Sequence, residues 1–586
     1  MAFEAIIQTP WAGPWRRFVD PVAIVQTSHA SDVKACLSAI EDRVRRERLF
    51  AAGFVSYEAA AAFGLPVAAS SPGDLPLVCF GLFRRGGVAT LATLPEGRPH
   101  RTGAWIPSID SAEYDAAVRQ IKERIAAGDT YQINFTFRLN ARFDGDPRSL
   151  LGQLAAAQAG EWGAWVETDA HAICSASPEL FFTLAGGRIV CRPMKGTAPR
   201  GLYTADDEKQ ALLLQTSEKN RAENVMVVDM VRNDLGRIAR YGTVKVVSLY
   251  DVERFPAHWQ MTSEVNADLT EASSTLAGVF EALFPSGSVT GAPKHSSMNI
   301  IRALETAPRG IYTGAIGYLT PEGDAHFNVA IRTVTVDKRR GVAEFGVGSG
   351  IVWDSTERDE YAECLLKAAI LTEQGSRAHP AGVADFELLE TMKWTPTGGF
   401  ALLDRHLARL ADSAGYFGFS LSRENIAEAL AAATRGRMVP ARVRLRVSRG
   451  GEVACDVSDL VPAPGIVRVA VAAAPVDRRN VFLYHKTTRR DVYEAAQASR
   501  PEAGAVILWN EAREITEATT HNVVAEIGGR RITPPIECGL LAGTMRAELL
   551  DAGEIAAGRI TVEDLRSATG VWLINSVSGW TRAALE

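Results

Sequence analysis

Two glutamates, Glu360 and Glu363, lie three residues apart just before an apolar run. Residues with this spacing share one face of a helix, where two carboxylates could hold an oxygen-ligated cation. A solvated acidic face is the more common fate of such a pair. Because the apolar run follows directly, we expect at least one carboxylate to point inward, where an unpaired charge is costly. The spacing alone keeps a cation site and a solvated face both open.

Lysine and glutamate also occur where they could act as nucleophile and acid. A desolvated, partly deprotonated lysine amine is a nucleophile, and a carboxyl group in an apolar wall can stay protonated and act as a general acid. Glu179 begins an apolar strand, and Lys195 follows 16 residues later. Taken alone, these are ordinarily a strand-end glutamate and a solvated lysine. Lys486, which two arginines follow, would likewise be a solvated basic stretch.

The elements that position these residues are strands mixed with amphipathic helices. The clearest helix is capped by Asp110, has an apolar stripe from Tyr114 to Ile125 and ends at Gly128. Other helices are predicted at 217–235, 358–373 and 405–413. Strands are predicted at 131–137, 179–183, 188–191, 441–447 and 467–472.

The 586 residues are too many for one hydrophobic core, so we expect at least two domains. A stretch rich in Gly, Pro and Ala at 375–384 predicts the boundary. We therefore expect a first domain at 1–375, a linker at 376–384 and a second domain at 385–586. The fold class is expected to be α/β (α+β), with a large layered sheet-and-helix domain before a smaller one.

Composition excludes several classes of protein. The chain has 47% apolar residues, a net charge of −6 and no block of Lys or Arg, which speaks against nucleic acid or an anionic membrane as the main partner. No basic leader and no run of about 18 apolar residues is present, so we expect a cytoplasmic protein. The seven cysteines are far apart, which favours reduced thiols. None lies in a Gly-x-Cys-x-Gly motif, so a glutaminase nucleophile is not expected.

Five segments of the first part resemble motifs of the chorismate-utilising enzymes, in that family's order. They are 191–200 (CRPMKGTAPR), 227–236 (VVDMVRNDLG), 284–294 (FPSGSVTGAPK), 327–333 (FNVAIRT) and 348–352 (GSGIV). Within the family, Lys195 in Pro-Met-Lys-Gly-Thr is similar to the aminodeoxychorismate synthase component I pattern, whereas anthranilate synthases have alanine there. Met194 in place of the usual isoleucine is a small departure.

The resemblance implies amination of chorismate in two steps. Lys195 would attack a ring carbon while Glu179 protonates the departing C4 hydroxyl, and ammonia would then displace the lysine. Glu223, Glu360 and Glu363 would hold magnesium.

Further residues would bind the two carboxylates of the substrate. These are Arg332, the backbone of Gly348, Ser349 and Gly350, and Lys367. His258 matches a family histidine near the ring, with a structural histidine as the alternative. Thr290 would contact substrate or support a tight turn.

From residue 385 the chain resembles the fold-type IV pyridoxal-phosphate enzymes, which include transaminases and aminodeoxychorismate lyase. The motifs are 386–391 (FELLET), 406–410 (HLARL), 485–488 (HKTT), 516–522 (TEATTHN) and 539–546 (GLLAGTMR). Lys486 would be the Schiff-base lysine and proton carrier, and Glu517 would pair with the pyridine nitrogen. Arg409 and the backbone of Thr544 and Met545 would hold the phosphate.

Together the resemblances imply that the chain converts chorismate and ammonia through 4-amino-4-deoxychorismate to 4-aminobenzoate, a folate precursor, with magnesium and pyridoxal phosphate as cofactors. A separate glutamine amidotransferase would supply ammonia, and the second domain would form a homodimer. Three alternatives stay open: an anthranilate-synthase-like first half, an aminotransferase second half, or a non-catalytic chorismate-binding scaffold.

Overall fold

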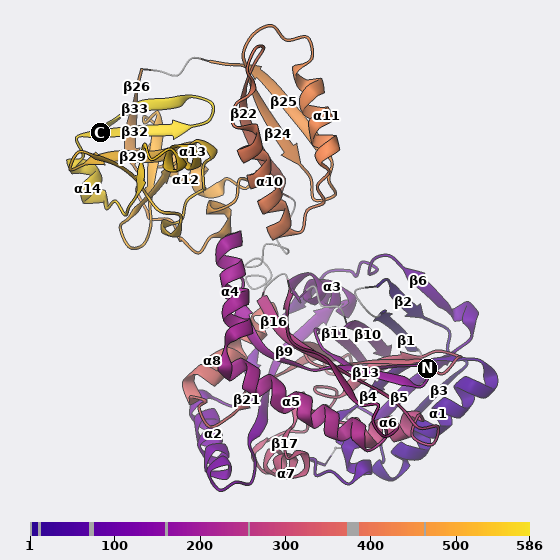
Figure 1. Cartoon of the computed structure of the whole chain (residues 1–586). Helices are drawn as coiled ribbons and strands as arrows, with labels where there is room; N and C mark the ends of the chain where they lie inside the picture. The colour runs from indigo at the N-terminus through magenta and orange to yellow at the C-terminus, as the bar shows by residue number, and fades with distance from the viewer. Residues whose placement is uncertain are drawn as a thin grey trace. The chain divides into compact units, whose positions relative to one another are not determined.

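A computed structural model describes residues 3–9, 13–69, 75–158, 162–255, 258–371, 386–461 and 465–586 (Figure 1). The chain forms two compact units. The first consists of Met1–Arg200 and Gln210–Gly382, and the second of Gly201–Lys209 and Val383–Glu586. The predicted linker at 376–384 lies outside the described residues.

Two large sheets form the first unit. In spatial order, the main path of one sheet is β17 (Gly291–Ala292), β9 (Gln132–Gly145), β21 (Val342–Ile351), β20 (Thr333–Asp337), β11 (His171–Ser177), β10 (Trp162–Thr168), β1 (Phe3–Gln8), β2 (Trp15–Phe18) and β6 (Val88–Leu91), with β7 (His100–Thr102) and β8 (Ile106–Pro107) on β9. The other is β14 (Met194–Pro199), β16 (His258–Asp268), β13 (Arg188–Arg192), β12 (Leu180–Ala185), β19 (Ala325–Val329), β18 (Ala315–Leu319), β4 (Phe50–Val55), β5 (Val78–Phe83) and β3 (Ala23–Thr27), with β15 (Lys245–Arg254) on β16.

Every described strand pairing in these two sheets is antiparallel, for example β9 with β21 and β14 with β16. A mixed, layered fold is thus confirmed, and α+β describes this unit better than α/β. Strands such as β5 and β18 are buried along their whole length because both faces are covered by apolar side chains.

The α-helices of the first part of the chain are α1 (Val33–Glu47), α2 (Ser111–Ala126), α3 (Pro147–Gln158), α4 (Thr204–Thr216), α5 (Glu218–Gly236), α6 (Leu276–Leu283), α7 (Lys294–Leu304) and α8 (Glu357–Ala368). The predicted start of α2 is confirmed, because Asp110 and Glu113 form a capping box. The helix predicted at 217–235 is α5, with Ser217 as its N-cap. The helix predicted from residue 358 is α8, which a 3₁₀ turn extends to Leu371.

The second unit contains two smaller sheets. One is β23 (Gly399–Phe400), β22 (Leu388–Thr395), β24 (Ala441–Val447) and β25 (Val453–Asp459), and Figure 1 shows α10 (Leu403–Phe417) and α11 (Arg423–Thr434) beside it. The other is β28 (Ile515–Ala518), β27 (Ala505–Trp509), β26 (Ile466–Val471), β33 (Gly579–Leu585), β32 (Gly570–Asn575), β29 (Asn522–Ile527), β30 (Arg530–Thr533) and β31 (Ala556–Ala557). Its helices include α12 (Asp491–Ala498), α13 (Thr544–Asp551) and α14 (Val562–Ser567).

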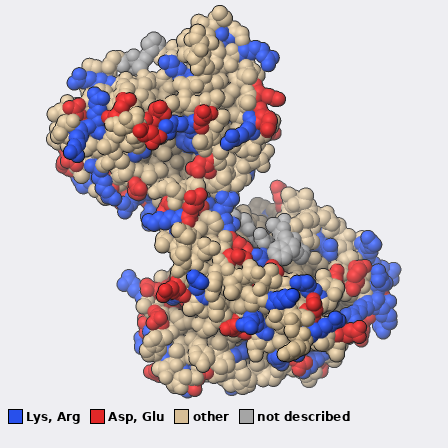
Figure 2. Space-filling view, viewed as in Figure 1, with Lys and Arg blue, Asp and Glu red and all other residues tan. Residues whose placement is uncertain are grey.

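The surface of both units mixes charges of the two signs. On the face drawn in Figure 2, basic and acidic side chains occur on each unit. In the described part of the chain, no helix is both long and apolar enough to cross a membrane.

Candidate active sites

The main chain around Lys195 is fixed by side-chain amides. Lys195 lies on β14, an end strand of its sheet. The amide of Asn224 donates to the Lys195 carbonyl oxygen at 3.3 Å, and that of Gln260 donates to the Gly196 carbonyl at 2.7 Å. Gly196 has a φ of 93°, a conformation that favours glycine. The backbone from which the Lys195 side chain extends is therefore held in one conformation.

The Lys195 amine lies over Gly350. A Cβ placed on Gly350 would be 2.5 Å from Lys195 Nζ and 2.7 Å from Gln132 Nε2. A side chain at this position would displace the ends of both side chains from where they converge. Gln132 is buried at 4% exposure. Sequence reasoning missed it, although a polar residue opening the apolar strand at 131–137 is a usable signal.

Glu179 lies between β11 and β12 and is 4% exposed. Burial raises the pKa of its carboxyl group to about 7, against the opposing effects of a hydrogen bond from Ser288 and the charge of Lys195. The Ser288 hydroxyl donates to Glu179 Oε1 at 2.6 Å. A carboxyl group that keeps its proton near neutral pH, within the field of a lysine, can serve as a general acid. Ser288, in the 284–294 motif, is a second residue that sequence reasoning left without a role.

The predicted anion-binding residues meet at β21 and α8. Arg332 has a φ of 52°, and its Nη1 donates to the Lys367 carbonyl at 2.5 Å. Burial lowers the pKa of Arg332 to about 10. Lys367 Nζ donates to the Gly348 carbonyl at 2.9 Å. The Ser349 hydroxyl lies 2.8 Å from that of Tyr114 in the core, so only the backbone of Ser349 is available to a ligand.

Thr290 and His258, two further predicted substrate contacts, each contact a nearby residue of the chain. Thr290 is fully buried, and its hydroxyl donates to the Ser286 carbonyl at 3.2 Å. This hydrogen bond agrees with the alternative in which its side chain supports a tight turn. His258 is half-buried at the start of β16, and its ring stacks on Phe255 at 5.2 Å.

The three glutamates proposed for a metal lie on α5 and α8. Burial raises the pKa of Glu223, to which the charges of Glu360 and Glu363 also contribute. Glu363 pairs with Lys367 at 2.6 Å, and Glu360 Oε1 accepts from Ser355. Within the described ranges, no three His, Cys, Asp or Glu side chains form a metal-holding group.

Carboxylate oxygens are ligands that suit a hard cation such as magnesium, but the three side chains are not gathered into one group in the described part of this structure. In this structure such a cation would compete with Lys367 for the carboxylate of Glu363.

In the second unit, Lys486 follows a 3₁₀ turn (Val481–Leu483) and precedes α12. Its carbonyl accepts from the N–H of Leu389 at 2.9 Å, which ties the loop to β22. Burial lowers the pKa of Lys486 to about 8, and the charge of Arg409 adds to this effect. A substantial fraction of the amine is therefore neutral near physiological pH and able to react with a carbonyl.

Glu517 lies on β28 and is 4% exposed. Its Oε1 accepts from the Tyr493 hydroxyl at 2.7 Å and from the N–H of Leu541 at 3.1 Å. Burial raises the pKa of Glu517 to about 7, although both hydrogen bonds oppose the shift. A buried carboxyl group of this kind fits a cationic nitrogen such as that of a pyridinium ring.

Arg409, on α10, is held in one orientation by Glu390. Its Nε and Nη2 donate to the two Glu390 oxygens at 2.9 and 2.7 Å. The Nδ1–H of His406 donates to the same carboxylate at 2.6 Å. Burial acts to raise the pKa of Glu390, but the charge of Arg409 and the hydrogen bonds from Arg409 and His406 outweigh it. This pKa is therefore held at about 2. Glu390 and His406 lie in two of the five motifs that carry the resemblance, 386–391 and 406–410, but neither had been assigned a role.

Thr544 and Met545 begin α13 after Gly543, which provides no side-chain cap. The first N–H groups of the helix are therefore open to an anion. Arg409 Nη1 donates to the Ala542 carbonyl at 3.0 Å, so its guanidinium lies at this same helix end. The Met545 side chain packs against an apolar cluster, which leaves its backbone for a ligand. This donor set fits the phosphate of pyridoxal phosphate.

Comparisons with known proteins match each part of the chain to a family. Residues 5–373 match the chorismate binding enzymes, and residues 387–585 match amino-transferase class IV. Over 274 residues the chain is 41% identical to aminodeoxychorismate synthase component 1 of Salmonella typhimurium, covering 47% of this chain and 60% of that protein. It is 36% identical over 267 residues to anthranilate synthase component 1 of Aquifex aeolicus, covering 46% of this chain and 53% of that protein.

Among solved structures, anthranilate synthase component I from Streptococcus pneumoniae has a similar fold. Its TM-score is 0.50 at 23% identity, covering 64% of this chain and 92% of that chain. The chain spans 60% of the length of the component 1 relatives from Salmonella typhimurium and Escherichia coli. Relatives with two different activities thus match one part of the chain, so the subtype depends on residues of the site.

Proposed function

The chain belongs to the chorismate binding enzymes, and from that premise we propose that it makes 4-aminobenzoate in two steps, one in each domain. The first domain aminates chorismate to 4-amino-4-deoxychorismate. The second, a class IV aminotransferase domain, releases pyruvate from that product. The observation that best supports the first step is the convergence of the Lys195 amine and Gln132 over Gly350.

In the first step, the Lys195 amine forms a bond to a ring carbon as the C4–O bond breaks. Glu179 gives its proton to the departing hydroxyl, which leaves as water. Ammonia then forms the C4–N bond as the lysine–ring bond breaks, and Lys195 is regenerated. Arg332 and the backbone of β21 hold the two substrate carboxylates.

Magnesium is proposed at Glu223, Glu360 and Glu363. There it would neutralise a substrate carboxylate and orient the ring. A test is the magnesium dependence of amination in the Glu223→Gln variant, for which the apparent magnesium affinity should fall. An unchanged magnesium requirement would exclude Glu223 as a ligand.

In the second step, bound pyridoxal phosphate would supply an electron sink for charge at the amine-bearing carbon. Lys486 removes the proton from that carbon and returns a proton to the enolpyruvyl group. Glu517 balances the pyridinium charge, while Arg409, Thr544 and Met545 bind the phosphate. Aromatisation of the ring drives the release of pyruvate.

The test is to incubate the protein with chorismate, magnesium, ammonium and pyridoxal phosphate and to follow 4-aminobenzoate by fluorescence. Lys195→Ala should make no amine product, and Lys486→Ala should accumulate 4-amino-4-deoxychorismate. Formation of anthranilate would favour the anthranilate-synthase alternative. Amino transfer to a keto acid would favour an aminotransferase second domain, and chorismate binding without turnover would favour a scaffold.

We also propose a glutamine amidotransferase partner and a homodimer through the second domain. The partner is supported by the lack of a Gly-x-Cys-x-Gly motif and by the printed name of the relatives, component 1. Glutamine should then replace ammonium only when the partner is added. Light scattering of the full chain would test the dimer.

A further inference from the structure

The second compact unit includes a segment from the first part of the sequence. Residues Gly201–Lys209 belong to this unit together with Val383–Glu586. Two aspartates fold the segment on itself. Asp207 Oδ1 accepts from the N–H of Gly201 at 2.9 Å, and Asp206 Oδ2 accepts from that of Leu202 at 2.9 Å. A Cβ on Gly201 would meet the Asp207 nitrogen at 2.1 Å, so this turn requires glycine.

The segment contacts the two residues that precede Lys486. The Leu202 carbonyl oxygen lies 3.2 Å from His485 Nε2. Since a carbonyl only accepts, the proton of this contact is on Nε2. The ring of Tyr203 stacks on that of Tyr484, with centroids 5.4 Å apart and planes 25° apart. The backbone on the amino-terminal side of Lys486 therefore packs against residues 202 and 203.

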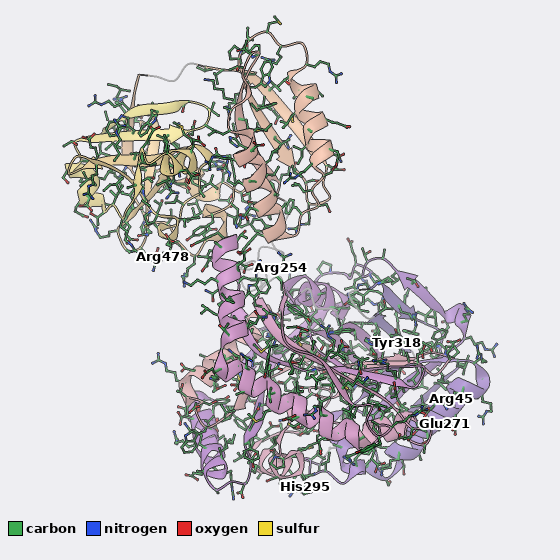
Figure 3. The ribbon with its side chains drawn as sticks, viewed as in Figure 1. Arg45, Arg254, Glu271, His295, Tyr318 and Arg478 are labelled. Carbon is green, nitrogen blue, oxygen red and sulfur yellow. The ribbon has the colours of Figure 1, made fainter. Side chains whose placement is uncertain are left out.

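Further contacts fix both partners in place. The Tyr416 hydroxyl donates to the Gly201 carbonyl at 2.6 Å, and the Tyr416 ring lies 4.4 Å from that of His485. The Tyr484 hydroxyl donates at 2.8 Å to the carbonyl of Arg478, which is labelled in Figure 3. The Tyr484 ring is thus held at its hydroxyl end by Arg478 and on its face by Tyr203.

The segment also forms one side of a cavity of about 370 Å³. Its contribution to the lining is Tyr203, Thr204, Ala205 and Glu208. Arg409, which is proposed to bind phosphate, and Tyr484 also line this cavity. The segment therefore packs against the two residues before Lys486 and also lines the cavity together with Arg409.

We propose that residues 201–209 are a positioning element of the second domain's active site, which holds the Tyr484–Lys486 loop and closes the cavity beside Arg409. The proposal rests on the proposed function in taking Lys486 as the reactive lysine. Its consequence is that the second site is complete only with a segment that begins six residues after Lys195. The two activities could then not be separated by dividing the chain at residue 385.

The test uses the full-length protein freed of cofactor, with Tyr203→Ala and, as a matched control, Tyr203→Phe, which keeps the stacked ring. The first measurement is the pH midpoint at which a small amine-reactive reagent modifies Lys486, read by mass spectrometry. The charged groups that affect this amine most, Arg409, Glu390, Arg490 and Glu517, lie outside the segment. A changed midpoint would therefore report exposure of Lys486 and not the loss of a neighbouring charge.

In Tyr203→Ala the midpoint should move up from about 8 toward that of an ordinary lysine. The Kd for pyridoxal phosphate should rise about two- to tenfold, as expected from the loss of one aromatic pair. Tyr203→Phe should match the wild type in both measurements. Asp207→Ala, which loosens the segment without touching Tyr484, should shift both in the same direction by less.

A folded Tyr203→Ala variant with the wild-type midpoint and Kd would overturn the proposal. So would a variant in which only the amination of chorismate is slower. If wild-type Lys486 reacts with the reagent but no pyruvate is released from 4-amino-4-deoxychorismate, the proposed function fails instead. The midpoint of Tyr203→Ala still decides the role of the segment in that case.

Discussion

Glu179 and Glu517 are buried glutamates, one in each proposed site, and we propose opposite roles for their carboxyl groups. Burial raises the pKa of Glu179 and of Glu517 to about 7. Glu179 accepts a side-chain hydrogen bond from Ser288, whereas Glu517 accepts from Tyr493 and from the N–H of Leu541. Additional donors stabilise an anion. We therefore expect Glu517 to ionise beside a cationic ring and Glu179 to keep its proton. Burial alone therefore does not assign the role of a carboxyl group.

The largest effect is expected from Glu179→Gln, which removes the proton donor without changing the size of the side chain. Amination of chorismate should slow by about 10²- to 10⁴-fold, the range typical of general acid catalysis. Release of pyruvate from supplied 4-amino-4-deoxychorismate should be unchanged. Assaying the two steps separately checks both statements, and equal losses in both steps would remove the contrast between the sites.

Glu58 provides a matched control for this substitution. Burial raises its pKa to about 7 as well, but its oxygens accept from the N–H groups of Arg309 and Gly310 at 2.6 and 3.0 Å. Glu58→Gln should therefore lower the melting temperature more than it lowers amination. An amination defect as large as that of Glu179→Gln would mean that any buried glutamate of this domain gives the effect.

A somewhat smaller effect is expected from Glu517→Gln, which keeps the contact with Tyr493 but loses the charge. The second step should slow by about 10²- to 10³-fold, as when one electrostatic partner is removed from a water-excluded site. Amination should continue, so 4-amino-4-deoxychorismate should accumulate. Tyr493→Phe separates charge from hydrogen bonding, and a loss as large as that of Glu517→Gln would assign the effect to the hydrogen bond.

Gly350→Ala addresses the geometry of the first site. The new Cβ would meet Lys195 Nζ at 2.5 Å and Gln132 Nε2 at 2.7 Å, so the amine must move. A displacement of about 1 Å costs up to about 10²-fold in rate, and kcat for amination should fall accordingly. Gly152→Ala is the control, because its Cβ meets nothing within 4 Å on α3. Equal rates for the two variants would show that Lys195 does not need its present position.

Local elements could be predicted from the sequence because they depend on nearby residues. The capping box of α2 and the alternation of 441–447 give the observed helix start and strand. Family motifs add the positions of Lys195 and Lys486, but not what surrounds them. Such motifs fix residue order, whereas the pKa of a lysine depends on burial and on charges distant in sequence.

The residues that sequence reasoning missed share a physical reason. Gln132, Ser288 and Glu390 act on a partner from another strand or helix, and the contacts between Ser288 and Glu179 and between Gln132 and Gly350 join positions more than 100 residues apart. The same holds for residues 201–209, which lie with the second unit although their neighbours in sequence belong to the first. Hydrophobic periodicity reports which face of an element is buried, not which element covers it.

The smallest effect is expected from Ser288→Ala, through the pH dependence of the first step. The 2.6 Å hydrogen bond from Ser288 opposes the effect of burial, so its loss should raise the pKa of Glu179 further above about 7. A general acid acts while protonated. Amination therefore falls as pH rises through this pKa, and the alkaline limb should move up by about one pH unit or less, the size of one hydrogen bond.

The raised pKa of Glu179 also predicts how the free energy of unfolding depends on pH. An unfolded glutamate loses its proton near pH 4.3, whereas the folded carboxyl group keeps it to about 7. The free energy of unfolding should therefore decrease as pH rises between these values, and Ser288→Ala should extend this window upward. The pH profile of kcat/KM for amination checks the shift of the alkaline limb, and urea unfolding at several pH values checks the stability window. Ser288→Thr keeps the hydroxyl and should restore both, whereas an alkaline limb that moves down in Ser288→Ala would contradict Glu179 as the acid.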